Sequence, residues 1–206
     1  MQSPEHEPDT APNITAMAVA FEGGLILLAL VLGWLFSVDP VATMRGGVGH
    51  LAVQGWAALW GVAATGPMLV LLLAADRYPV GPLRGLKQAV DDSILPLFEG
   101  TELAALAILS LLAGVGEEML FRGFLQPAIA GWTGETPWSV AVGVGVSALV
   151  FGLCHAITRT YFLAATLIGV YFGLLLLWTD SLLAPIVAHA LYDFVALAYM
   201  LHWRKR

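Results

Sequence analysis

Seven ionisable side chains interrupt stretches of the sequence that are otherwise apolar, and six of them lie in its second half. They are Glu22, Glu117, Glu118, Arg122, His155, His189 and Asp193. If those stretches cross a bilayer, each charged side chain costs at least about 2.5 kcal/mol to insert, so such residues face the inside of a bundle and have partners there. Carboxylates and imidazoles are the groups that proteins use for general acid–base catalysis and for binding metal ions.

The first cluster is the segment GEEMLFRGFLQP, residues 116–127. Glu118 and Arg122 are four residues apart, so on a helix they share a face and can pair. Glu117 points about 100° away and is left without that partner. We therefore expect Glu118 and Arg122 to support the helix and Glu117 to act as a general base. The alternative is a purely structural ion pair beside a glutamate that reaches toward the interface.

The other two clusters are FGLCHAI and APIVAHALYDF. In the first, Phe151 precedes His155 by one helical turn and can brace the imidazole, whereas Cys154 points about 100° away and is interpreted as a packing residue. In the second, His189 and Asp193 share a helix face, where the carboxylate can fix the histidine tautomer or both can meet a common ligand. The alternatives are a hydrogen-bonded core histidine and a His–Asp pair that ties two helices together. We expect all three clusters to converge on one internal cavity, because separate ionisable groups in lipid would be costly.

The elements that must position these residues are membrane-spanning helices. The chain is 59% hydrophobic and only 12% charged, about half the charged fraction of a soluble domain. Windows of about 20 apolar residues can span a bilayer, and six are present: 17–36, 56–75, 103–121, 138–156, 161–178 and 182–201. The predicted fold is all-α, a polytopic membrane helical bundle of about six transmembrane helices. We expect one transmembrane domain over 17–203, with its motif-bearing core at 100–200, after an acidic, disordered tail over 1–16.

Basic residues predict the orientation, since loops rich in Lys and Arg stay in the cytoplasm. Outside the first motif, one loop residue, Arg45, lies on the side opposite to the N-terminus. The seven on the same side are Arg77, Arg84, Lys87, Arg159, Arg204, Lys205 and Arg206. We therefore expect an integral, multi-pass protein of the cytoplasmic membrane with both termini in the cytoplasm.

Residues 83–97 predict a further helix between the second and third spans. Apolar residues recur there at three- and four-residue spacing: Leu83, Leu86, Val90, Ile94 and Leu97. This pattern favours an amphipathic helix on the cytoplasmic surface of the membrane; a linker helix packed on the bundle is the alternative. The net charge of −6 gives no reason to expect a nucleic-acid partner, and the single cysteine excludes an internal disulfide.

The depth of the clusters poses a geometric question. At 1.5 Å per residue, His189 lies about 10 Å below the outer end of its span, whereas His155 lies near the inner end of its own. For the two to meet, the spans must be tilted, shortened or broken. Gly114, Gly116 and Pro185 are positions at which the backbone could bend.

The three motifs, in this order, resemble those of the CPBP family of intramembrane proteases (CAAX prenyl protease and bacteriocin-processing, also called Abi). That family carries E-E-x-x-x-R, F-x-x-x-H and H-x-x-x-N or a near variant, and the resemblance covers about residues 100–200. It implies peptide-bond hydrolysis within the membrane. Glu117 would activate water, His155 would position it, and His189 with Asp193 would stabilise the oxyanion. The remaining motif residues, Glu118, Arg122 and Phe151, would support the site.

One departure from the family pattern is Asp193, where the family most often has Asn. An amide can donate a hydrogen bond to an oxyanion, but an ionised carboxylate would repel it. Asp193 would then be protonated, orient His189 or bind a cation. The resemblance favours a site without a cofactor. The alternative is a Zn²⁺ ion, because catalytic zinc sites commonly use three protein ligands and a water; its ligands would be drawn from Glu117, His155, His189 and Asp193.

The function that these observations predict is an intramembrane endopeptidase. Its substrate would be a membrane-associated or lipid-anchored peptide, with CAAX-type prenylated peptides among the candidates, and its surroundings the lipid bilayer. An ion- or proton-coupled transporter is one alternative, because buried acid and histidine chains also carry protons. A non-catalytic immunity or scaffold protein of the same fold is another. Glu22 belongs to none of these schemes, and the sequence does not indicate an oligomeric state.

Overall fold

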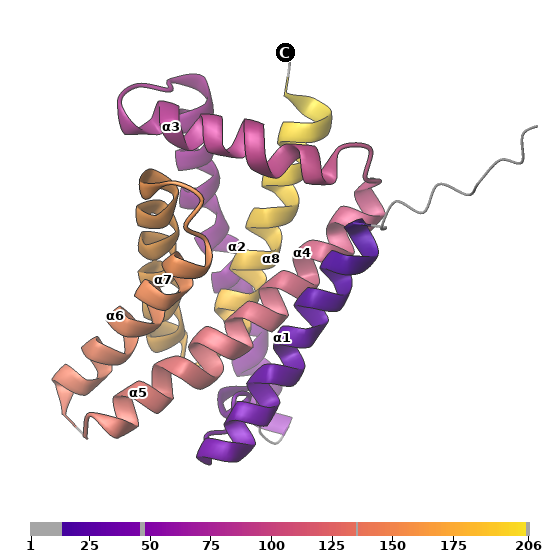
Figure 1. The fold of residues 1–206 in the computed structure, drawn as a ribbon. Helices are drawn as coiled ribbons and strands as arrows, with labels where there is room; N and C mark the ends of the chain where they lie inside the picture. The colour runs from indigo at the N-terminus through magenta and orange to yellow at the C-terminus, as the bar shows by residue number, and fades with distance from the viewer. Residues whose placement is uncertain (1–13, 46–47, 135, 205–206) are drawn as a thin grey trace, which may run out of the picture.

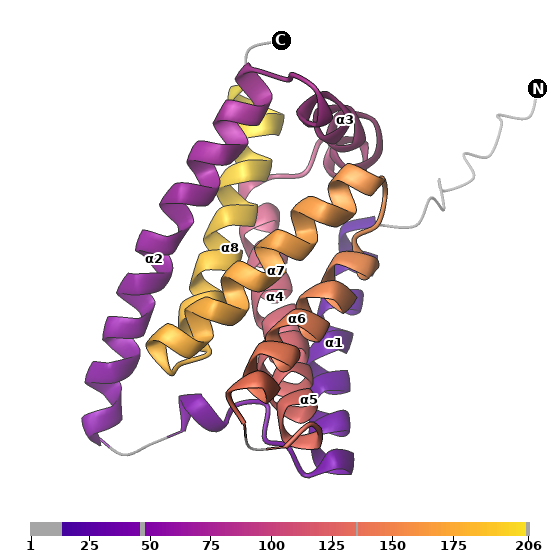
Figure 2. The same ribbon diagram turned by 90° about the vertical axis from the view of Figure 1, so that its left-hand side faces the viewer.

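The computed structural model describes residues 14–45, 48–134 and 136–204, and in these ranges all the regular structure is helical (Figures 1 and 2). The acidic tail expected over 1–16 lies outside the described residues except for its last three positions. The α-helices are α1 (Ile14–Phe36), α2 (Val48–Arg77), α3 (Pro82–Ala89), α4 (Leu103–Glu118), α5 (Gln126–Trp132), α6 (Pro137–Cys154), α7 (Arg159–Thr179) and α8 (Leu183–Ala198).

Five short segments with other helical geometries join or extend these helices. Two are 3₁₀ turns, η1 (Ala42–Met44) and η3 (Leu95–Phe98), and three are π-helical, η2 (Val90–Ile94), η4 (Met119–Leu125) and η5 (Tyr199–Trp203). Through η4, helices α4 and α5 form one helical segment, Leu103–Trp132. The helix that contains the third expected span is therefore longer than 103–121, the apolar window that predicted it.

The expected polytopic helical bundle is confirmed. Five helices are long and apolar enough to cross a membrane: Ala16–Phe36, His50–Arg77, Leu103–Trp132, Arg159–Thr179 and Leu183–Trp203. The remaining expected span, 138–156, corresponds to a shorter apolar helix, Trp138–Cys154. Large apolar side chains cover the outside of the bundle; Leu71 and Leu167, for example, are each 70% exposed. Such an exterior is suited to hydrocarbon, because a soluble protein rarely exposes apolar patches of this extent.

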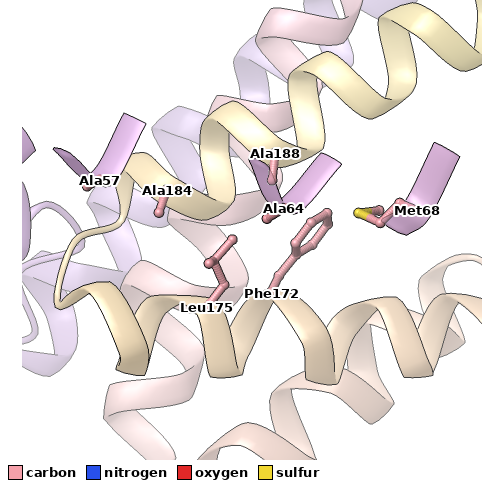
Figure 3. Packing of buried hydrophobic residues seen from close by; sticks show 7 residues of the cluster. All are labelled: Ala57, Ala64, Met68, Phe172, Leu175, Ala184 and Ala188. Atoms are coloured by element: carbon pink, nitrogen blue, oxygen red, sulfur yellow. The ribbon is translucent and has the colours of Figure 1, made fainter. Parts of the chain in front are cut away.

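Helix α8 holds the bundle together, since it contacts α2, α4 and α7. Small residues line its contact with α2. Figure 3 shows Ala184 and Ala188 of α8 beside Ala64 of α2, with Phe172 and Leu175 of α7 filling the space between them. Small side chains of this kind let transmembrane helices approach closely, which gains dispersion contacts that lipid cannot replace.

Glycines bring two helices against α4 immediately before its acidic pair. A Cβ atom at Gly114 would lie 2.9 Å from the Cβ of Ala190 in α8, and one at Gly116 would lie 2.6 Å from the backbone oxygen of Glu22 in α1. These two glycines, considered above as places to bend, thus serve close packing, while the irregular backbone lies after them in η4. Gly169 also allows close packing, because a Cβ there would lie 2.9 Å from the Cα of Ala148 in α6.

The segment from α3 to η3 lies across the end of the bundle at which the C-terminus emerges (Figure 1). An ion network fastens it there. Asp76, near the end of α2, binds Lys87 of α3, accepts a hydrogen bond from Arg204 at 3.1 Å and accepts another from the Tyr199 hydroxyl at 3.0 Å. Arg204 also pairs with Asp91 at 2.8 Å. The amphipathic segment is therefore packed on the helix ends and not separate from the bundle.

Candidate active site

A buried ion pair forms the centre of the candidate site. Arg122 donates to Glu118 Oε1 at 2.9 Å, as their four-residue spacing predicts, and both side chains are excluded from solvent. The second guanidinium nitrogen donates to the backbone oxygen of Gly169 in α7 at 3.0 Å. The guanidinium also lies 4.4 Å from the ring centre of Phe151, within cation–π range. Arg122 thus connects η4 with α6 and α7.

The π-helical segment η4 carries Arg122 directly after the acidic pair. A π-helical turn is rare and often occurs at functional sites, because it disturbs the regular backbone hydrogen bonding of the α-helix. In η4 the backbone oxygen of Phe121 accepts a hydrogen bond from the Ser147 hydroxyl of α6 at 2.7 Å. The same carbonyl also accepts a hydrogen bond from the backbone N–H of Gln126, so the Ser147 hydroxyl adds a second bond that joins η4 to α6.

His189 of α8 is held by a carboxylate at each ring nitrogen. Its Nδ1 lies 2.8 Å from Glu118 Oε1, and its Nε2 lies 3.3 Å from Asp193 Oδ2. A carboxylate oxygen accepts hydrogen bonds, so Nδ1 carries a proton that it donates to Glu118. The ring of Phe172 stacks on the imidazole with centroids 5.1 Å apart. These contacts fix the orientation of the ring, with Nε2 nearest to Asp193 and 4.0 Å from Glu117 Oε2.

Glu117 lies between two imidazoles. Its Oε2 atom is 3.7 Å from His155 Nε2 and 4.0 Å from His189 Nε2. Both separations exceed a normal hydrogen bond, and among the described residues this buried oxygen has no hydrogen-bond partner. A buried carboxylate oxygen without a protein partner is costly and marks a position at which water or a ligand is expected. The two adjacent glutamates therefore differ in their surroundings. Glu118 Oε1 binds Arg122 and His189, while its Oε2, like the Oε2 of Glu117, has no hydrogen-bond partner among the described residues. Only at Glu117 does the free oxygen lie near two imidazole nitrogens.

His155 ends α6 and is only partly buried. Its Nδ1 lies 2.8 Å from the backbone oxygen of Phe151, so Nδ1 donates to this carbonyl and Nε2 faces Glu117. The Phe151 ring lies 4.5 Å from the imidazole and also packs on Phe121, with centroids 5.2 Å apart. Phe151 thus braces His155, as expected. Cys154 is exposed, and its thiol interacts electrostatically with Glu117.

The structure brings all three motifs together and adds contacts that the sequence did not predict. Phe172 stacks on His189, and Glu118 reaches across from α4 to the same histidine. A third addition is Glu22 of α1, whose carboxylate interacts electrostatically with His189 and Asp193. No spacing in the sequence signals any of these contacts, because each joins different helices.

The possible Zn²⁺ ligands named from the sequence lie in one cluster. Over the described ranges, no three His, Cys, Asp or Glu side chains are grouped so that they could hold a metal ion. Nδ1 of His189 is committed to Glu118, so only its Nε2 could bind a metal ion.

Comparison with known proteins agrees with this geometry. Residues 99–195 match the family model described as type II CAAX prenyl endopeptidase Rce1-like. These residues form an Rce1-like domain. Every site residue that the motifs predicted, from Glu117 to Asp193, lies inside it, and the resemblance to the CPBP family is thereby confirmed.

One relative has a similar sequence over part of its length. The "Uncharacterized protein YpbD" of Bacillus subtilis (strain 168) is 31% identical over 102 residues, which are 48% of this chain and 47% of the relative. The chain thus spans about half the length of the curated relative that it matches. No solved structure matches the chain.

Proposed function

We propose that this protein is an intramembrane endopeptidase that hydrolyses a peptide bond with water activated by Glu117. The observation that carries the proposal is the Oε2 atom of Glu117. It is buried without a protein partner and lies 3.7 Å and 4.0 Å from two imidazole nitrogens inside an Rce1-like domain. A carboxylate in this position can take the proton of a water molecule, and an imidazole can hold that water.

In the proposed reaction, Glu117 removes a proton from water as the water oxygen bonds to the scissile carbonyl carbon. The carbonyl oxygen becomes an oxyanion, and His189 stabilises it through Nε2–H. Glu118 and Arg122 keep His189 in place through their hydrogen bonds, which is the kind of preorganisation that such stabilisation requires. The carbon–nitrogen bond then breaks, and the proton held by Glu117 passes to the leaving amine.

Asp193 has a separate role in this proposal. Its Oδ2 atom lies 3.3 Å from His189 Nε2, which supports the second of the three roles considered for it, the orientation of His189. The proposal needs no cofactor, since water, Glu117 and the two histidines supply the nucleophile, the base and the oxyanion donor.

The proposed substrate is a membrane-associated or lipid-anchored peptide, with CAAX-type prenylated peptides among the candidates. The match to a family of CAAX prenyl endopeptidases supports this class of substrate, as does the placement of the site within a bundle whose exterior is apolar. We further propose that the protein resides in the cytoplasmic membrane with both termini inside. The excess of basic residues on one side supports this orientation.

The test is cleavage of membrane-anchored peptides, farnesylated CAAX peptides included, by the purified protein in liposomes. We expect Glu117→Ala and Glu117→Gln to lose cleavage, because neither side chain can accept the proton of water. Glu102→Gln is the matched control, since Glu102 is exposed and its side chain caps nothing at the start of α4. A chelator should have no effect. Cleavage by Glu117→Ala at the wild-type rate would contradict the proposal, and a loss with chelator that Zn²⁺ restores would replace it with a metal mechanism.

A further inference from the structure

Glu22 of α1 lies next to the acidic pair although it is almost one hundred residues away in sequence. Its backbone oxygen packs against Gly116, where a Cβ atom would lie only 2.6 Å from it. The two helices therefore touch one residue before Glu117. The family match begins at residue 99, so neither α1 nor Glu22 is part of the matched segment.

The carboxyl group of Glu22 is turned toward the site. Its Oε2 atom is buried and has no hydrogen-bond partner among the described residues. It interacts electrostatically with His189 and Asp193 of α8, and with Glu117 of α4. The preceding residue, Phe21, is 64% exposed and lies on the outside of the helix.

Among the described residues, no salt bridge involves Glu22, although its carboxyl group interacts electrostatically with His189. Of the segments that pack most closely on α1, α4 and η3 contain no lysine or arginine, and η4 contains one cation, Arg122. Arg122 already binds Glu118 and the backbone oxygen of Gly169. A buried carboxyl oxygen without a partner costs stability, so its presence suggests a function.

We propose that Glu22 is a positioning residue of this site that, together with Glu117, holds the water molecule to be activated. Buried waters typically make about three hydrogen bonds to polar groups that would otherwise be unsatisfied. Two such groups are the buried Oε2 atoms of Glu22 and Glu117, which interact electrostatically and could each accept one of the two hydrogens of a water molecule. The Nε2 atom of His155, 3.7 Å from Glu117, lies on the other side of that glutamate oxygen and can donate to the water when the ring is protonated at both nitrogens. Glu22 itself neither gains nor loses a proton in the reaction. This inference rests on the proposed function.

The experiment compares Glu22→Ala and Glu22→Gln with wild type in the liposome assay, and measures the melting temperature of each protein. Glu22→Ala should lower kcat about ten- to one-hundred-fold, the effect of a misplaced reactant, with little change in KM. Glu22→Gln should retain most of the rate, because its amide can still hydrogen-bond to water. Neither change should lower the melting temperature, since the carboxyl oxygen has no protein partner to lose. Glu102→Ala, an exposed acid outside the site, is the control.

The outcomes separate this inference from the proposed function. If Glu117→Ala is inactive while Glu22→Ala matches wild type in kcat, only the assignment of Glu22 fails. If Glu117→Ala cleaves as fast as wild type, the proposed function itself fails. A melting temperature that falls with both Glu22 variants would assign Glu22 a structural role and overturn the inference, whether or not a cleaved peptide is known. Equal loss of kcat in Glu22→Gln and Glu22→Ala would also overturn it.

Discussion

The substitution Arg122→Met tests whether the buried ion pair supports the site. Methionine keeps most of the length of the arginine side chain but removes its charge and its donors. Glu118, which is completely buried, would retain only His189 as a partner, and the backbone oxygen of Gly169 would lose its donor. Removing one partner of a buried ion pair costs about 3–5 kcal/mol, and an unsatisfied buried carbonyl costs about 1–3 kcal/mol. These losses overlap, so we expect the free energy of unfolding to fall by about 4 kcal/mol.

The measurement is reversible unfolding in mixed detergent micelles, followed by tryptophan fluorescence. The double variant Glu118→Gln/Arg122→Met should be more stable than Arg122→Met alone, because it no longer buries an unpaired carboxylate. Arg84→Met, at an exposed arginine of α3, should change stability by less than about 0.5 kcal/mol. The reasoning would be refuted if Arg122→Met cost less than about 1 kcal/mol of stability, well below the range for a broken buried pair. It would also be refuted if the stability changes of Arg122→Met and Glu118→Gln, measured separately, simply added in the double variant.

Three further substitutions test other contacts. Gly116→Ala should destabilise the protein by about 1–3 kcal/mol, because its Cβ would lie 2.6 Å from the backbone oxygen of Glu22. The control Gly24→Ala, with open space around it, should not destabilise the protein. Equal melting temperatures of the two variants would contradict this prediction. Asp193→Asn should cleave at least as fast as wild type, because an amide keeps the hydrogen bond to His189 and can also donate to the oxyanion. An inactive variant would show that the carboxylate is required. Asp76→Asn should accelerate amide hydrogen exchange across residues 82–98, because it weakens the contacts of this side chain with Lys87, Tyr199 and Arg204. Unchanged exchange would mean that apolar packing alone holds the segment.

Contacts within one helix could be predicted from the sequence. Four-residue spacing places Arg122 beside Glu118 and Asp193 beside His189, and the structure has both pairs. The apolar windows likewise predicted the spanning helices, since bilayer thickness sets their length. Both rules depend only on the number of residues per helical turn and on local composition, so they can be applied to a single amino-acid sequence.

Contacts between helices could not be predicted in this way. The hydrogen bond from His189 to Glu118 joins α8 to α4, and the stacking of Phe172 joins α7 to α8. Such contacts depend on helix tilt and on which small residues let two backbones approach. Neither factor produces a periodic pattern in the sequence. Glu22 was singled out as a charged residue in an apolar span, but its role could be inferred only once Gly116 placed α1 against α4.

The two glycines named as places where the backbone could bend, Gly114 and Gly116, lie in regular helix, where the missing side chain makes room for α8 and α1. The irregular backbone occurs after them in η4, which contains another glycine, Gly123, and receives a hydrogen bond from a hydroxyl of α6. Glycine in a membrane helix has two uses, flexibility and close approach, and only the neighbouring helix decides between them.

The hydrogen bonds around Arg122 and Glu118 limit the route by which a peptide can reach Glu117 from the lipid. They tie together α4 with η4, α7 and α8. Separating α8 from α4 would take His189 from the buried Glu118, and separating α7 from η4 would take the Gly169 carbonyl from Arg122; losing such partners in the interior is more costly than separating apolar side chains. A lateral opening should therefore form at a helix outside this set, such as α1, and the three tied helices should move as one rigid wall while the substrate enters.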